Sequence, residues 1–256
     1  MGVFMQASER RMKIFEILQL HNNVEINELA TEFQVTTMTI RRDLMLFESK
    51  GLVTTTYGGA YLNKGATIEP SFMLKTTQNK EDKSRIALKA AAYIKDGDFI
   101  IIDCGTTTYE LVKYLTNKKL TVITNSLPVI NYLKDYENIT LIMAPGQYDD
   151  TSAGAIGSLT IHFYEQLKAD KVFVSTQGLD VEYGLSVPGM IDRDVKKAIL
   201  NAAKEKYLLV DHTKFNQTYF AAFASVDEFD FIISDQEAPS AIHDKIKNKA
   251  ISYIIA

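Results

Sequence analysis

The sequence of 256 residues has one cysteine and no long apolar run. Because Cys104 is alone, an intramolecular disulfide and a cysteine-rich zinc or iron–sulfur site are both excluded. The longest apolar stretches, residues 99–102 and 251–255, are far too short to cross a bilayer. The N-terminus lacks the apolar core of a signal peptide, and the histidines have no metal-ligand spacing. These shortages predict a cytoplasmic protein without membrane contact, metal or other cofactor.

Positive charge is also scarce. Lys and Arg number 28 against 32 Asp and Glu, and the resulting net charge of −4 argues against coating nucleic acid by bulk electrostatics. A local basic surface is still allowed, because phosphate contacts need only a few well-placed cations. The 46% of hydrophobic and 23% of charged residues are ordinary for a globular protein, and the length suits two domains.

Residues 1–62 carry the pattern of three short helices and a hairpin. Apolar residues recur at helical spacing up to Leu20, again from 26 to 33, and again from 40 to 47. Thr36 or Thr37 can cap the third helix, and Gly51 stands where that helix should stop. The Thr- and Tyr-rich stretches 52–57 and 60–62 flank a Gly-Gly turn. Together these elements predict a winged helix-turn-helix domain.

The third helix has the polar surface expected of a recognition helix in the major groove. Arginine can hold phosphate or bridge guanine, and threonine can do either more weakly. An isolated arginine pair is usually a solvated surface, but its place in a trihelical unit with a hairpin behind it favours DNA binding. The predicted DNA-binding residues are Thr36, Thr37, Met38, Thr39, Arg41, Arg42 and Tyr57.

This first domain is nevertheless not basic, since residues 1–62 hold six Lys and Arg against seven Asp and Glu. DNA binding must then depend on charge placement and on two domains acting together, so we expect a homodimer or homotetramer that reads a repeated site. Residues 63–80 are polar and weakly patterned, and we interpret them as a linker.

Strand and helix patterns alternate from residue 81 to 256. Helical patterns lie around 86–94, 109–115, 159–167, 195–203 and 241–247, and they fall between most of the short apolar strands at 99–102, 121–124, 140–143, 171–175, 207–210, 231–234 and 252–255. This alternation predicts an α/β domain with a mainly parallel sheet that helices cover on both faces.

Turns at the ends of three predicted strands can bind an anion. In the first turn, glycine lets a ligand approach the backbone while hydroxyls and N–H groups donate. By itself that turn fits a plain helix cap equally well, but a second Asn- and Ser-bearing turn beside it favours phosphate. In the third turn, the alternative is a solvated surface pair. The predicted effector-binding residues are Asp103, Gly105, Thr106, Thr107, Thr108, Thr124, Asn125, Ser126, Asp211 and Lys214.

Several of these segments, in this order, resemble the DeoR family of bacterial transcriptional regulators. The resemblance is carried by Thr39–Leu44 and Gly58–Ala60, and then by Asp103–Thr108, Thr124–Ser126, Gly184–Ser186 and Asp211–Phe215. Thr36 stands where the family usually has Ser, and Thr55 and Tyr57 stand where it usually has Arg and His, which removes donors from the wing. The resemblance implies a sensor domain with the fold of ribose-5-phosphate isomerase, whose corresponding loops hold sugar phosphates.

We therefore predict a regulator, most often a repressor in this family, of sugar-metabolism genes. It is expected to bind double-stranded operator DNA with an affinity that a phosphorylated sugar changes. The alternative is a sugar-phosphate isomerase or deaminase with an accessory head, because Asp103, Asp211 and Lys214 supply acid–base groups. A third interpretation, an adaptor whose head binds protein, rests on the non-basic head. An isomerase has no use for a winged head, which favours the regulator, and we predict no catalytic residue.

Overall fold

The computed structural model describes residues 7–49, 51–63, 72–239 and 251–256. The chain divides into two compact units, Met1–Gln78 and Asn79–Ala256. Within the described part, no helix combines the length and apolar character that crossing a bilayer requires. The helical pattern at 241–247 and residues 64–71 of the stretch interpreted as a linker lie outside the described residues, while helix α4 (Phe72–Thr77) falls within that stretch.

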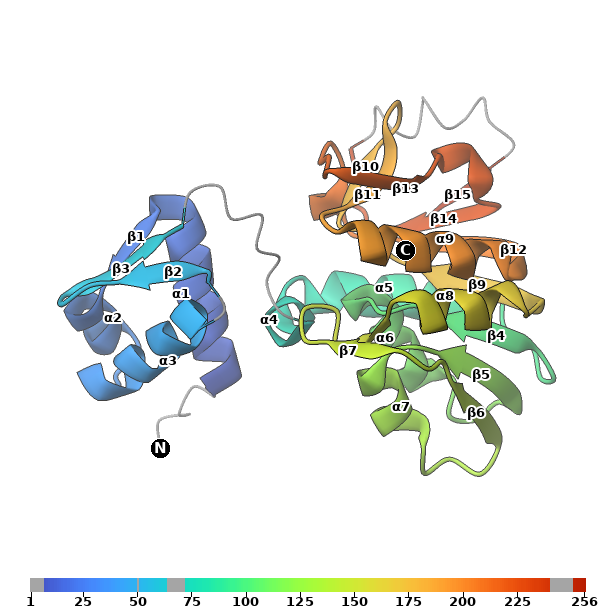
Figure 1. The fold of residues 1–256 in the computed structure, drawn as a ribbon, viewed down its shortest axis with the longest axis horizontal. Coiled ribbons are helices and arrows are strands. Elements are labelled where there is room, and N and C mark those ends of the chain that lie inside the picture. Colours follow the sequence, from blue (N-terminus) through green and yellow to red (C-terminus); the bar gives the residue numbers. More distant parts are fainter. Residues whose placement is uncertain (1–6, 50, 64–71, 240–250) are drawn as a thin grey trace. The chain divides into compact units, whose positions relative to one another are not determined.

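The first unit holds the three predicted helices and the hairpin (Figure 1). The elements are α1 (Ala7–His21), β1 (Asn23–Glu25), α2 (Ile26–Glu32), α3 (Thr37–Ser49), β2 (Val53–Thr55) and β3 (Gly59–Leu62). Strand β1 was not predicted; it pairs antiparallel with β3 and gives the sheet order β1-β3-β2. Of the two candidate caps, Thr36 is the one whose hydroxyl accepts a hydrogen bond from the Thr39 N–H, at 3.2 Å.

A buried carboxylate joins α1 to α3. Asp43 is 1% exposed, and its two oxygens lie 2.7 Å from Arg10 Nε and 2.6 Å from Arg11 Nε. Each oxygen therefore has a guanidinium of its own, which is the arrangement that compensates the cost of burying a charge. Because both arginines point at Asp43, they stabilise the fold of the first unit and are not part of the predicted DNA-binding set.

All seven predicted strands form one parallel sheet in the second unit. They are β4 (Phe99–Ile102), β5 (Leu120–Thr124), β6 (Ile139–Met143), β9 (Ala169–Val174), β12 (Ala203–Leu209), β14 (Phe231–Ser234) and β15 (Ser252–Ile255). Their order is β15-β14-β12-β9-β4-β5-β6, and every neighbouring pair is parallel. This confirms the predicted α/β fold class and places all the carboxyl ends of the strands at one edge.

Helices cover both faces of this sheet (Figure 1). One core contains Ile100 and Ile102 together with apolar residues of α5 (Lys80–Ala91), α6 (Thr106–Leu111) and α7 (Leu127–Leu133). The other contains Ile101 together with residues of α8 (Ser158–Glu165) and α9 (Met190–Asn201). Successive residues of β4 enter opposite cores, so the strand reads as a continuous apolar run.

Short strands outside the main sheet were not predicted. β10 (Gly178–Asp180), β11 (Gly184–Val187) and β13 (Ala221–Ala224) form an antiparallel sheet, and β7 (Gln147–Asp149) pairs with β8 (Gly154–Ile156). The single-turn helices are η1 (Val112–Tyr114), η2 (His212–Lys214) and η3 (Val226–Glu228). These short strands consist largely of glycine, alanine and polar residues and lack the run of large apolar side chains that marks β4, which is why the sequence pattern does not reveal them.

Substituting Asp43→Ala is expected to destabilise the first unit by about 3–5 kcal/mol, because Arg10 would stay buried without its counter-ion. The matched control is Arg11→Ala, since the Arg11 side chain is 34% exposed and water can replace it as a partner for Asp43. Chemical denaturation followed by amide NMR of head residues measures both. Equal losses of unfolding free energy for the two variants would contradict the larger stabilising role assigned to the buried Arg10–Asp43 pair.

Candidate functional site

The N-terminal half of α3 presents part of the predicted DNA-binding set to solvent. Thr37, Met38 and Arg42 are exposed, Met38 to 57%. By contrast, the hydroxyls of Thr36 and Thr39 lie 3.0 Å apart and hydrogen-bond each other as part of the helix cap. Thr37, Met38 and Arg42 thus face solvent, whereas the hydroxyls of Thr36 and Thr39 cap the N-terminus of α3.

Arg41 and Tyr57, which are 16 residues apart, meet between α3 and the wing. Arg41 Nη2 donates a hydrogen bond to the Tyr57 carbonyl oxygen at 3.0 Å, and its guanidinium carbon lies 5.8 Å from the centroid of the Tyr57 ring. The Tyr57 side chain is otherwise free, with 95% of its surface exposed. The contact is a cation–π pair at the surface of the head.

A buried ion pair lies at the carboxyl end of β4 in the second unit. Asp103 Oδ2 lies 2.5 Å from Lys196 Nζ on α9, and both side chains are 2% exposed. Lys196 also donates to the Ser175 carbonyl oxygen at 3.1 Å, and Ser175 N–H donates to Asp103 Oδ2 at 3.3 Å. The pair thus ties together the end of β4, the end of β9 and helix α9.

The surroundings set the charge state of the neighbouring groups. Burial by itself would lower the pKa of Lys196, but the carboxylate of Asp103, with Asp192, raises that pKa above its usual value. Burial and the charge of Asp103 raise the pKa of the Cys104 thiol well above its usual range. Lys196 is therefore a cation and Cys104 a neutral thiol, which is unsuited to nucleophilic chemistry.

The first predicted anion turn lies directly on this ion pair. Gly105 precedes α6, and a Cβ there would stand 1.9 Å from Ser175 Oγ, so no larger residue fits without movement. The Thr108 hydroxyl lies 2.9 Å from the carbonyl oxygens of Asp103 and Gly105 and bonds within the turn. Thr107 is buried, whereas Thr106 is half-buried and its hydroxyl has no hydrogen bond among the described residues.

The second predicted turn lies beside the first, because β4 and β5 are neighbours. Thr124 Oγ1 donates to the Ile102 carbonyl oxygen at 2.6 Å, and Asn125 Nδ2 donates to that of Ala155 at 2.8 Å. These side chains therefore hold the loops together. The Oγ of Ser126 is buried without a hydrogen-bond partner in the described part of the chain.

The third turn is separate from the first two. Asp211 follows β12, which β9 separates from β4 in the sheet. Its Oδ1 accepts a hydrogen bond from Thr213 N–H at 3.1 Å and another from the Thr213 hydroxyl, so Asp211 caps η2. Although burial raises the pKa of Asp211, the nearby Lys214 and the Thr213 bonds lower it overall. Asp211 is thus an anion held by its own loop.

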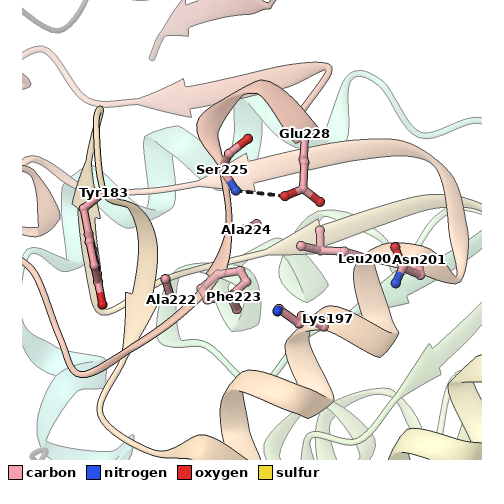
Figure 2. Close-up of a pocket in the computed structure, with 9 residues that line it drawn as sticks. All are labelled: Tyr183, Lys197, Leu200, Asn201, Ala222, Phe223, Ala224, Ser225 and Glu228. Atoms are coloured by element: carbon pink, nitrogen blue, oxygen red, sulfur yellow. Dashed lines mark hydrogen bonds between the residues drawn. The ribbon is translucent and has the colours of Figure 1, made fainter.

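An open cavity of about 440 Å³ lies elsewhere and contains none of the predicted site residues. It lies between α9 and the segment around β13, and Figure 2 shows Lys197 and Asn201 of α9 facing Phe223 and the Ser225–Glu228 turn. Lys197 lines this cavity while the preceding Lys196 is buried against Asp103. Glu228 accepts a hydrogen bond from Ser225 N–H at 2.9 Å, so its carboxylate is engaged in a capping box.

Sequence reasoning missed Lys196 and Ser175. A signal for Lys196 was present: it lies on the buried side of α9, next to Val195 and one turn before Ile199 and Leu200. A lysine on the apolar face of a helix must have a buried anion as its partner. Ser175 carries no such signal, because its backbone and not its side chain contacts the ion pair.

Comparison with known proteins identifies both units. The family model described as "DeoR-like helix-turn-helix domain" matches residues 10–66. The model described as "DeoR C terminal sensor domain" matches residues 78–236. Together the two matches span most of the chain, and each falls almost entirely within one of the two units.

Proteins of similar sequence carry the names of regulators. The lactose phosphotransferase system repressor of Lactococcus lactis is 36% identical over 239 residues, which are 91% of this chain and 92% of that protein. The transcriptional regulator IolR of Bacillus subtilis is 32% identical over 228 residues, covering 89% and 90%. Among solved structures, ribose 5-phosphate isomerase A of Methanocaldococcus jannaschii is 20% identical with a TM-score of 0.40, and the match covers 54% of this chain and 55% of that one.

Replacing Lys196 by Met should lower the free energy of unfolding of the second unit by about 3–5 kcal/mol, because Asp103 would stay buried without a cation. The matched control is Lys197→Met on the exposed side of α9, which should change stability by less than about 0.5 kcal/mol. Similar losses for both variants would contradict the importance of the buried pair.

The same pair predicts a pH dependence. Because the pKa of Lys196 is raised on folding, its stabilisation is fully present below the pKa of an unfolded lysine, about 10.4, and is lost as the pH rises through the folded-state pKa. The stability difference between wild type and Lys196→Met should therefore stay constant from neutral pH to about 9 and shrink in more alkaline solution. Urea unfolding at a series of pH values measures it.

Proposed function

This chain belongs to the DeoR family of transcriptional regulators, and we propose that it represses genes of sugar metabolism by binding operator DNA until a phosphorylated sugar occupies its second unit. The names of the lactose phosphotransferase system repressors among its relatives support the metabolic context. The observation that carries the proposal is that one chain holds both features: the solvent-facing helix α3 in the first unit and the glycine-containing turn before α6 in the second.

The sheet edge around Asp103 supports an anionic, hydroxyl-rich ligand. Gly105 lets the Ser175 side chain pack against the turn, and Thr106 offers a hydroxyl without an internal partner among the described residues. The buried Ser126 hydroxyl lies beside them on the next turn. We assign the phosphate group to the Gly105–Thr107 turn and the sugar hydroxyls to Asn125, Ser126 and Asp103. Asp211 and Lys214, in the turn that follows β12, form a second contact region for the far end of the ligand.

Regulation is favoured over catalysis by the state of the carboxylates. An isomerase needs a carboxylate that is free to take a proton from carbon. Asp103 is neutralised by Lys196, and Oδ1 of Asp211 caps η2, although its buried Oδ2 has no hydrogen-bond partner among the described residues. Because Asp103 is held in an ion pair and Asp211 in a helix cap, we propose that this chain binds the sugar phosphate without converting it.

Coupling requires that the ligand bind the DNA-competent and incompetent arrangements with different affinities. A ratio of about one hundred corresponds to roughly 2.7 kcal/mol. We place the head at residues 1–62, the linker at 63–80 and the sensor at 81–256, and we propose that two or four chains assemble. The spacing of the paired heads is then the property that the effector changes.

The test is a DNA-binding titration of the purified full chain on its own upstream region, with and without ribose, fructose, glucosamine and other sugar phosphates. We expect tight binding that one of these ligands weakens by roughly 100-fold. Absence of DNA binding under every condition would refute the proposal, and conversion of any of the sugar phosphates would favour the enzyme instead.

A substitution separates effector binding from DNA binding. Thr106→Val keeps the shape of the side chain and removes one hydroxyl, so the effector concentration needed for release should rise about tenfold. DNA affinity without effector should stay unchanged. The matched control is Thr121→Val, another half-buried threonine, near the start of β5 and thus at the opposite end of the sheet. An equal effect of both variants would contradict the assigned position of the phosphate.

A further inference from the structure

The turn of the wing is held in place by backbone contacts. The Thr56 N–H donates to the Gly59 carbonyl oxygen at 2.8 Å, and the Gly58 carbonyl oxygen accepts from the Ile26 N–H at 2.8 Å. A Cβ on Gly59 would stand 1.9 Å from the Val24 carbonyl oxygen, so the turn lies directly against β1. Tyr57 therefore projects from a rigid backbone although its side chain is in solvent.

A second set of contacts joins this turn to α3. Arg41 holds the Tyr57 carbonyl oxygen with one N–H and lies over the face of the same ring. The hydrogen bond holds the backbone of Tyr57 and the cation–π contact lies on one face of its ring, so neither contact covers the hydroxyl. At the other end of the helix, Glu48 Oε1 accepts from Thr55 N–H at 2.8 Å, which fixes the preceding strand of the wing.

The two adjacent arginines of α3 therefore differ. Arg41 is half-buried and engaged with Tyr57, whereas Arg42 is exposed and makes no hydrogen bond or ion pair with any described residue. Only Arg42 has all five of its N–H donors available for a bidentate contact to guanine. The wing, in turn, offers the neutral hydroxyl of Tyr57 as a donor to DNA.

We infer that Arg41 is a positioning residue, which holds Tyr57 so that its hydroxyl contacts the DNA phosphate backbone, and that Arg42 is the arginine of α3 that reads bases. This inference rests on the proposed DNA-binding function. Phosphate contacts carry no sequence information, whereas base contacts do. Loss of Tyr57 or of its support should accordingly weaken binding to every DNA sequence equally, and loss of Arg42 should weaken only the specific complex.

A double-variant cycle on the full chain tests the dependence of one residue on the other. Tyr57→Ala and Arg41→Gln should each weaken operator binding about tenfold, and the double variant should be no weaker than either single variant. Effects that multiply would show two independent contacts and overturn the inference. Tyr57→Phe should match Tyr57→Ala, because it keeps the ring and removes the hydroxyl; wild-type affinity of this variant would also overturn it.

Two further readouts distinguish positioning from direct contact. Arg41→Gln should weaken the operator and a scrambled duplex of equal length by the same factor, whereas Arg42→Gln should weaken the operator alone. The slope of log affinity against log salt should not change in Arg41→Gln; a decrease of about 0.9 would show that Arg41 itself neutralises a phosphate. Thermal unfolding of each variant verifies that the head is folded.

The wild-type titration in the same series distinguishes a wrong positioning role of Arg41 from a wrong assignment of DNA binding. Wild-type binding with independent effects of Arg41 and Tyr57 refutes only the positioning role. No binding of the wild type to any duplex refutes the proposed function and this inference together.

Discussion

An ammonium and a carboxylate that are both removed from water organise the second unit. Burying the charge of either Asp103 or Lys196 at 2% exposure is unfavourable without the other. The folded second unit therefore keeps the end of β4 next to helix α9. The Ser175 carbonyl oxygen accepts a hydrogen bond from Lys196. The lack of a side chain at Gly105 lets the Ser175 side chain lie close to the turn after β4. The shape of the proposed effector site is therefore a consequence of how one buried charge is neutralised.

Residues 1–62 also contain a buried carboxylate that is neutralised by cationic side chains. Asp43 is buried between Arg10 and Arg11, and it fixes the helix that carries the exposed Arg42. The arginines of residues 1–62 thus differ in their contacts: Arg10 and Arg11 stabilise the fold and Arg41 contacts the wing, while Arg42 is the one that we propose for base contacts. A net count of charges overestimates the positive charge of the surface, because the two arginines that pair with buried Asp43 count as much as the cations that face solvent.

Much of the fold follows from the sequence because its strands are buried on both faces and its helices are amphipathic. All seven strands of the parallel sheet were predicted, whereas β10, β11 and β13 were not, since these segments are rich in glycine and alanine and have no run of large apolar residues. The residues assigned to the site stay a prediction. Thr106 and Gly105 are placed by local pattern, but the role of Lys196 depends on a partner 93 residues away, and Arg41 gives no sign in the sequence that it faces Tyr57.

The separation of Asp103 from Lys196 along the chain also bears on biosynthesis. The partners that stabilise the head lie 33 residues apart, so this unit can fold soon after its last strand leaves the ribosome. Asp103, by contrast, has no counter-ion until α9 has been made, and the end of β4 cannot be buried at low cost before then. A nascent chain of this protein consequently carries a folded DNA-binding head before it has a sensor able to respond to any ligand.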